Sequence, residues 1–381
     1  MSFTRNHRYP SVKKRYAMWA VLFSVGTLAM PATVLASNET ESFTTDSERY
    51  FKSEDIFNLE YVSEVQVSPN GKNIAYVRRS NDIMSDSSRA NVWLASVDGK
   101  SHRPLLSSKK NYYSIRWSPD GSRLAYLSNE EGKPQLYVRW MDTGQTALVT
   151  NVTSSPSNIT WSPDGKYIAF TMSVDAKEKP LDVKMPKKPE GAKWSPKFQY
   201  ITKARYQADG KGVLDPAYTH IFIVPSDGGT ARQLTSGNYH HNGRLSFAPN
   251  GEKIYFSANR SDNWEYEPVE ADIFSVDMTG NIEQLTQDKG RESSPVVSPD
   301  GKYIAYAYRD DENVMYKNSY LYVMNSDGSE QRNITKDIDN SVSNFHWKDN
   351  KRIYFQQSVR GLAQVDVVSL SGSVKAVAKG L

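Results

Sequence analysis

The sequence predicts an all-β protein, a β-propeller made of four-stranded blades. Three observations carry this prediction: a turn phrase recurs along the chain, an apolar β-type core follows each copy, and a glycine turn comes late in each repeat. A repeat length of about 45–50 residues is typical of solenoids and propellers, and two tight turns per repeat favour a propeller blade.

The turn phrase has the form Ser-Pro-Asp-Gly with small variations. Proline fixes φ at the first central position, Asp or Asn tolerates the second, and glycine accepts the left-handed conformation that closes the turn. The prolines lie 50, 44, 86 and 50 residues apart, and the copies stand at residues 67–71, 117–121, 161–165, 247–251 and 297–301, with a degenerate sixth at 347–350.

Each turn is followed by two predicted strands, a glycine turn and a last short strand, which together make one blade. The first run of each repeat is short and β-rich, at residues 74–76, 124–126, 168–170, 254–256, 304–306 and 353–355. The second is clearest at residues 135–140, 220–225, 272–277 and 320–325. Six repeats are therefore visible. They form either a complete six-bladed ring or an incomplete seven-bladed one, whose missing blade would leave two unpaired sheet edges.

The meander of antiparallel strands places the two kinds of turn on one face of the ring, which we call the regular face. The loops between the second and third strands lie on the opposite, elaborated face, with the links between blades. These loops hold the irregular sequence, in an insert at about 174–216 and in segments 259–271 and 309–319. Because binding residues often lie on loops held by a rigid scaffold, we expect function on the elaborated face.

Composition excludes several classes of function. The chain has 381 residues, of which none is Cys, so disulfides, thiolate metal sites and cysteine nucleophiles are excluded. The net charge of +4 comes from the N-terminus, because residues 1–36 hold five basic residues and no acid. The rest is nearly neutral, so nucleic acid is not an expected partner.

Residues 1–36 read as a cleavable signal peptide. A basic segment precedes the apolar run 17–30, and Val34-Leu35-Ala36 supplies the small-x-small pattern for cleavage after Ala36. An uncleaved anchor is the alternative, although the run is short for a membrane span. We expect a periplasmic or secreted bacterial protein without stable membrane insertion, with a lead-in at 37–61 and the propeller at 62–381.

No catalytic residue, cofactor or metal site is predicted. The sequence has no Gly-x-Ser-x-Gly elbow and no calcium loop, and its one histidine cluster is His240-His241. Adjacent residues in an extended chain point in opposite directions, so this pair is poorly suited to bind one metal ion.

The densest polar and aromatic loop is the candidate substrate-binding segment. It contains Trp264, Glu265, Tyr266 and Glu267, and Arg260 precedes it. Two carboxylates beside two aromatic rings could hold the free amino group of a peptide through charge and cation–π contact. The alternative is that the rings pack over the blade edge while the acids face water. The Lys-rich segment 184–188, with Lys193, reads as an exposed flap.

Longer phrases resemble a known family. Segments 206–212, 219–222, 227–230, 232–237, 257–260 and 263–268 look like the N-terminal propeller of secreted bacterial prolyl-oligopeptidase-family serine peptidases, closest to the acylaminoacyl-peptidase and dipeptidyl-peptidase branch. The resemblance spans about residues 51–381. The Ser-Pro-Asp-Gly repeats alone are less specific, because TolB-like propellers share them.

The resemblance implies that a propeller of seven or eight blades precedes an α/β-hydrolase domain. That domain carries the Ser, Asp and His, and the propeller restricts access to short peptides. No position here matches the triad, so this chain is expected to be the substrate-gating and selecting module of an exported serine exopeptidase, catalytically incompetent without its hydrolase partner. If the native ring has seven blades, residues 37–381 are expected to fold only marginally. The alternatives are a stand-alone TolB-like propeller that binds a protein or envelope partner, and a propeller enzyme with a metal in its channel.

Overall fold

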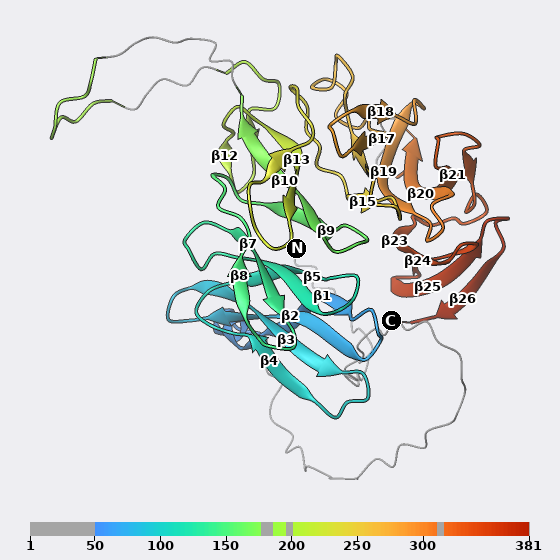
Figure 1. Ribbon diagram of the computed structural model, residues 1–381, viewed down its shortest axis with the longest axis horizontal. Helices are drawn as coiled ribbons and strands as arrows, with labels where there is room; N and C mark the ends of the chain where they lie inside the picture. Colours follow the sequence, from blue (N-terminus) through green and yellow to red (C-terminus); the bar gives the residue numbers. More distant parts are fainter. Residues whose placement is uncertain (1–49, 177–185, 196–200, 311–315, 381) are drawn as a thin grey trace, which may run out of the picture.

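The computed structural model describes residues 50–176, 186–195, 201–310 and 316–380. Six four-stranded antiparallel sheets follow one another around a ring, so the predicted β-propeller is confirmed (Figure 1). In every sheet the strands pair as a meander, and the first strand of each sheet lies toward the centre of the ring. The predicted second runs of blades 2, 4 and 5 coincide with β7, β17 and β21.

The blades are numbered in chain order. Blade 1 contains β1 (Glu60–Val67), β2 (Asn73–Asp82), β3 (Ser87–Ser96) and β4 (His102–Leu106). Blade 2 contains β5 (Tyr112–Trp117), β6 (Arg123–Ser128), β7 (Gln135–Trp140) and β8 (Thr146–Leu148). Blade 3 contains β9 (Ser157–Trp161), β10 (Tyr167–Asp175), β13 (Ala217–Pro225) and β14 (Arg232–Gln233).

Blade 4 contains β15 (Ser246–Phe247), β16 (Lys253–Ala258), β17 (Asp272–Asp277) and β18 (Ile282–Gln284). Blade 5 contains β19 (Gly290–Val297), β20 (Tyr303–Asp310), β21 (Tyr320–Asn325) and β22 (Arg332–Asn333). Blade 6 contains β23 (Ser343–Asp349), β24 (Arg352–Val359), β25 (Leu362–Ser369) and β26 (Val374–Ala378). A 3-10 helix, η1 (Ser53–Asn58), precedes blade 1, and a hairpin of β11 (Gln207–Ala208) and β12 (Gly212–Val213) lies in the insert of blade 3.

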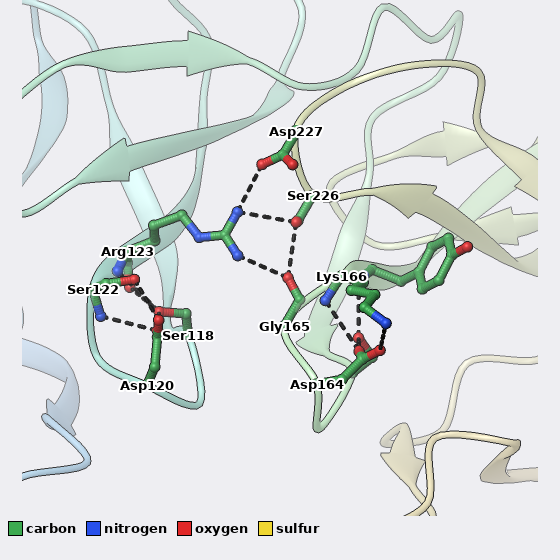
Figure 2. Close-up of polar contacts among 11 residues, drawn as sticks. Ser118, Asp120, Ser122, Arg123, Asp164, Gly165, Lys166, Ser226 and Asp227 are labelled. Atoms are coloured by element: carbon green, nitrogen blue, oxygen red, sulfur yellow. Dashed lines mark hydrogen bonds and ion pairs between the residues drawn. The ribbon is translucent and has the colours of Figure 1, made fainter.

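The recurring turn phrase closes by a repeated set of hydrogen bonds. In blade 2, the Ser118 hydroxyl donates to Asp120 Oδ1 at 2.6 Å and accepts from the backbone N–H of Arg123 at 2.9 Å (Figure 2). Gly121 takes the left-handed φ of 72° that the sequence predicts. Hydrogen bonds from Ser118 and Ser122 lower the pKa of Asp120 to about 2. The same serine-to-acid bond recurs in blades 3 and 5, which explains why the phrase is kept along the chain.

Neighbouring blades are held together by apolar cores. Five hydrophobic clusters lie between consecutive blades from 1 to 6. None of them, within the described part of the chain, joins blade 6 to blade 1. The burial of one aromatic residue on the second strand differs between blade 1 and later blades. Tyr126 of blade 2 and Tyr306 of blade 5 are fully buried against the preceding blade, whereas Tyr76 of blade 1 is only half-buried.

The tryptophans of the turn phrase donate hydrogen bonds to the preceding blade. Trp117 donates its indole N–H to the carbonyl of Gln66 at 3.2 Å, and Trp161 donates to the carbonyl of Arg116 at 3.0 Å. Arg123 donates to the Gly165 carbonyl, to Ser226 and to Asp227, so one guanidinium joins the turns of blades 2 and 3 (Figure 2). These contacts place both kinds of turn on the regular face, as the meander predicts.

In five of the six blades, all except blade 4, the first strand carries an irregularity that the sequence did not indicate. A bulge interrupts its pairing, and a non-glycine residue there takes a left-handed φ between 47° and 58°. Such bulges bend a strand and redirect its side chains. The five residues are of three types, so no single side chain marks the pattern in the sequence: Glu64, Ser114, Asn158, Ser294 and Asn344.

Candidate functional site

The insert of blade 3 and the loop of blade 4 meet on the elaborated face. Lys203 Nζ forms an ion pair with Glu265 Oε1 at 2.6 Å, and the backbone N–H of Ala204 donates to Glu265 Oε2 at 3.2 Å. The Glu265 side chain is only 16% exposed. Burial raises the pKa of Glu265, but the bonds from Lys203 and Ala204 outweigh it and leave that pKa below its usual range. Glu265 is therefore an ionised anchor for the insert.

Aromatic rings surround the Lys203 ammonium. Its Nζ lies 5.7 Å from the ring centre of Tyr218 and 5.9 Å from that of Trp264, within the range of cation–π attraction. Trp264 packs edge-on against Tyr218 and against His240. The carboxylate and ring that the sequence singled out as a cation site thus hold a cation of this chain, Lys203.

The tip of the loop is open to solvent. Tyr266 is 79% exposed, and the Glu267 side chain is exposed and makes no hydrogen bond or ion pair with another described residue. Only the backbone of Glu267 is held, because Asn259 Nδ2 donates to its carbonyl at 2.7 Å. The loop therefore presents a fixed backbone with a free carboxylate and a phenol ring at its tip.

Arg260 lies apart from this tip. Its Nη1 donates to His241 Nε2 at 2.7 Å, and its guanidinium stacks over Tyr239 at 4.7 Å. His241 donates from Nδ1 to the Thr219 carbonyl at 3.0 Å, and burial lowers its pKa to about 3, so Nε2 is a neutral acceptor. Arg260 thus ties the loop of blade 4 to the link between blades 3 and 4.

The two adjacent histidines separate, as the extended chain predicts. His240 contacts Trp264 and Tyr218, while His241 contacts His220 and Phe256. Among the residues that the structure describes, no group of three His, Asp or Glu is arranged to hold a metal ion. The Lys-rich segment 184–188 falls partly outside the described residues, and Lys193 is exposed.

Two family profiles match the chain. The TolB beta propeller domain matches residues 70–214, and the dipeptidyl peptidase IV N-terminal region matches residues 193–316, which includes Lys203 and the whole loop of blade 4. The resemblance to peptidase propellers is confirmed. Together the two profiles cover the chain from residue 70, after β1 of blade 1, through blade 4 and part of blade 5.

Similar proteins include peptidases of about twice this length or more. The chain is 31% identical over 210 residues to the uncharacterized peptidase YuxL of Bacillus subtilis, which covers 55% of this chain and 31% of the relative. It is 23% identical over 368 residues to dipeptidyl-peptidase 5 of Porphyromonas gingivalis, which covers 92% of this chain and 53% of the relative. The chain therefore spans about half or less of the length of these peptidases.

Solved structures share the fold. Acylaminoacyl peptidase of Pyrococcus horikoshii superposes with a TM-score of 0.65 at 17% identity, over 85% of this chain and 47% of that one. The β-propeller domain of the trilobed protease from Pyrococcus furiosus superposes with a TM-score of 0.56 at 17% identity, over 84% of both chains. None of the described helices is long and apolar enough to cross a bilayer.

A buried acidic pair next to the loop was missed by sequence reasoning. Glu292 is fully buried and accepts from Thr286 Oγ1 at 2.8 Å, and Asp272 accepts from Gln284 at 2.9 Å. Burial and the charge of Asp272 raise the pKa of Glu292 to about 8, and burial with the charge of Glu270 raises the pKa of Asp272 to about 6. Glu292 is therefore protonated at neutral pH. No motif marks it, because its partners come from different strands.

Proposed function

We propose that this propeller is the substrate-selecting module of an exported serine exopeptidase that acts on short peptides. The observation that carries the proposal is the match of residues 193–316 to the dipeptidyl peptidase IV N-terminal region, because that segment holds the most elaborated loop and the insert attached to it. The similarity to dipeptidyl-peptidase 5 along nearly the whole chain supports it. Export rests on the signal-peptide pattern of residues 1–36.

The loop of blade 4 would receive the amino terminus of the peptide. Glu267 offers an exposed carboxylate for the ammonium group, and Tyr266 offers a ring beside it. Trp264, Glu265 and Arg260 act as positioning residues in this proposal, because their contacts with the insert and with His241 fix the loop. A carboxylate held on a fixed backbone binds an ammonium group without first having to be ordered.

Hydrolysis would come from a partner α/β-hydrolase domain. This sequence has no Gly-x-Ser-x-Gly elbow, so we propose that the chain by itself hydrolyses no peptide. The propeller would then act by admitting short peptides and orienting their amino termini toward the catalytic domain.

Peptide binding to the purified propeller tests the role of Glu267. Calorimetric titration with a dipeptide amide bearing a free amino group should give an affinity at least tenfold above that of the N-acetylated form. Glu267→Gln should remove that preference, whereas Glu330→Gln, at an exposed acid on the regular face, should keep it. Equal affinity of the wild-type protein for the free and acetylated peptides would refute the amine-binding role.

A TolB-like binding module is the second candidate. The TolB beta propeller profile matches residues 70–214, and the Tol-Pal system protein TolB of Alcanivorax borkumensis is 35% identical over 82 residues, 21% of this chain. The profile match ends before the loop of blade 4. A stable complex with an envelope protein that survives Glu267→Gln would favour this second function.

A further inference from the structure

Two arginines from different blades lie at the inner side of the ring. Arg116 lies on β5 of blade 2, and Arg244 lies just before β15 of blade 4; β5 and β15 are the first strands of their blades, which lie toward the centre (Figure 1). Arg244 Nη1 reaches the carbonyl of Phe345 at 3.5 Å, and Nη2 reaches His346 Nδ1 at 3.4 Å. These partners belong to blade 6, so the Arg244 side chain connects blade 4 with blade 6.

Neither guanidinium is neutralised by a carboxylate. Among the residues that the structure describes, Arg116 donates one hydrogen bond, from Nη1 to the adjacent carbonyl of Ile115 at 2.8 Å, and Arg244 makes only the two long contacts with blade 6. No ion pair joins either arginine to an acid in the described part of the chain. Since each guanidinium carries five N–H donors, most donors of both groups are unused.

Burial makes the unpaired positive charges of these two guanidinium groups energetically unfavourable. Burial lowers the pKa of both arginines, and the charge of Arg116 lowers that of Arg244 further. The acid that acts on Arg116 is Glu64, but its carboxylate already accepts from the Ser114 N–H and pairs with Arg79. Partly buried cations without a counter-charge are unfavourable unless an anion joins them.

We propose that the centre of the ring binds a small oxyanion, a carboxylate or a phosphate, between Arg116 and Arg244. The planar fork of a guanidinium matches both anions, and two such groups can hold one anion from opposite sides. His346 stands beside this site as a neutral neighbour, because burial and the charge of Arg244 lower its pKa to about 4. The site lies apart from the loop of blade 4 and does not require it.

Two sources could supply the anion: inorganic phosphate, or the free C-terminal carboxylate of a peptide. The second source rests on the proposed function, because a peptidase propeller meets short peptides. A dipeptide with a free carboxylate and the same dipeptide as its amide separate the two, since only the first carries the anion.

Calorimetric titration of the whole chain with phosphate, at constant ionic strength in chloride, tests the site. Arg116→Gln and Arg244→Gln should each weaken phosphate binding at least tenfold, whereas Arg103→Gln, at an exposed arginine of β4, should leave it unchanged. Phosphate should also raise the melting temperature of the wild-type protein above that in matched chloride. If this rise saturates at millimolar phosphate, it reports a binding site rather than the non-specific stabilisation that excluded salts cause at higher concentration, and it needs no variant.

Titrations with the dipeptide acid and with its amide then show whether the bound anion is a peptide carboxylate or an inorganic ion. Binding of the acid but not of the amide, lost in Arg244→Gln, assigns the site to a peptide carboxylate, and binding of phosphate alone assigns it to an inorganic anion. Absence of binding by phosphate and by the dipeptide acid overturns the proposal, as does equal binding by the wild type and both arginine variants. A failure of the amine-binding role would instead appear as equal affinity for free and acetylated amino termini, with phosphate binding intact.

Discussion

Lys203 and Glu265, 62 residues apart in the sequence, form an ion pair that fastens the insert of blade 3 to the loop of blade 4. The same ammonium lies against two aromatic rings, so one ion pair and two cation–π contacts converge on one side chain. The exposed tip of the loop, with Tyr266 and Glu267, therefore stands on an anchored base. This arrangement explains how a loop on the elaborated face can present a carboxylate in a fixed place.

Removing the anchor should release the insert. Glu265→Gln leaves Lys203 without its ionised partner, so we expect faster proteolytic cleavage within residues 201–216. Glu267→Gln is the matched control and should leave the cleavage rate unchanged. Limited proteolysis followed by mass spectrometry measures both, and equal rates in the two variants would argue against the anchoring role.

The anchor should also respond to acid. Because the pKa of Glu265 is lowered in the folded protein, its ion pair contributes stability above the ordinary glutamate pKa and loses it as pH falls through the lowered value. Cleavage in residues 201–216 should therefore accelerate at low pH in the wild-type protein. In Glu265→Gln the rate should already be high at neutral pH, after correction for the pH dependence of the protease.

The buried acid Glu292 should make stability fall as pH rises. Its folded pKa of about 8 lies above the ordinary value of 4.5, so the protonated form stabilises the fold, and this stability is lost between about pH 5 and pH 8. At about 1.4 kcal/mol per pKa unit, we expect a loss on the order of 3–4 kcal/mol across this range. Glu292→Gln should flatten the profile, whereas Glu330→Gln should not; urea unfolding at several pH values measures this. A flat wild-type profile would contradict the assignment.

Two equivalent turn glycines should differ in their tolerance of alanine. Gly328 and Gly99 both have a left-handed φ, but a Cβ at Gly328 would lie 2.5 Å from the Leu285 carbonyl of the preceding blade, whereas one at Gly99 meets nothing within 4 Å. Gly328→Ala should cost roughly 1–3 kcal/mol more than Gly99→Ala because of overpacking. Equal losses of stability for the two variants in thermal unfolding would show that the two blades move apart at this contact without an energetic penalty.

Each indole hydrogen bond between blades should stabilise the fold by about as much as one ordinary hydrogen bond. Trp161→Phe keeps an aromatic ring beneath Arg123 but removes the donor to the Arg116 carbonyl, so we expect a loss of about 1 kcal/mol. Blade 4 has Phe247 at the equivalent position, which shows that the ring alone fits the fold. Unchanged stability in denaturant unfolding would mean that water replaces the indole donor at no cost.

The blades were predictable because their turns are local. The proline, the acid and the glycine of each phrase act within five residues, so their order in the sequence already dictates the turn, as the bonds of Ser118 and Asp120 confirm. The left-handed bulges were not predictable. Glu64 and Asn158 share a backbone conformation but no side-chain chemistry, and the conformation comes from pairing within the blade.

The candidate site was only partly predictable for the same reason. The sequence singled out Trp264 and Glu265 as a place for a cation, but the cation that occupies it, Lys203, comes from a distant insert. The contact of Arg244 with His346 spans 102 residues and depends on the curvature of the whole ring. Contacts of this range follow from how the blades are arranged around the ring and leave no local pattern in the sequence.

The central claim is that this propeller works within an exported peptidase. The intact mass of the native product in the envelope fraction of its source organism tests this most directly. We predict a mass well above the 43.0 kDa of this sequence, by the size of a hydrolase domain. A mass near 43.0 kDa less the signal peptide would contradict the claim and leave the propeller as a binding module.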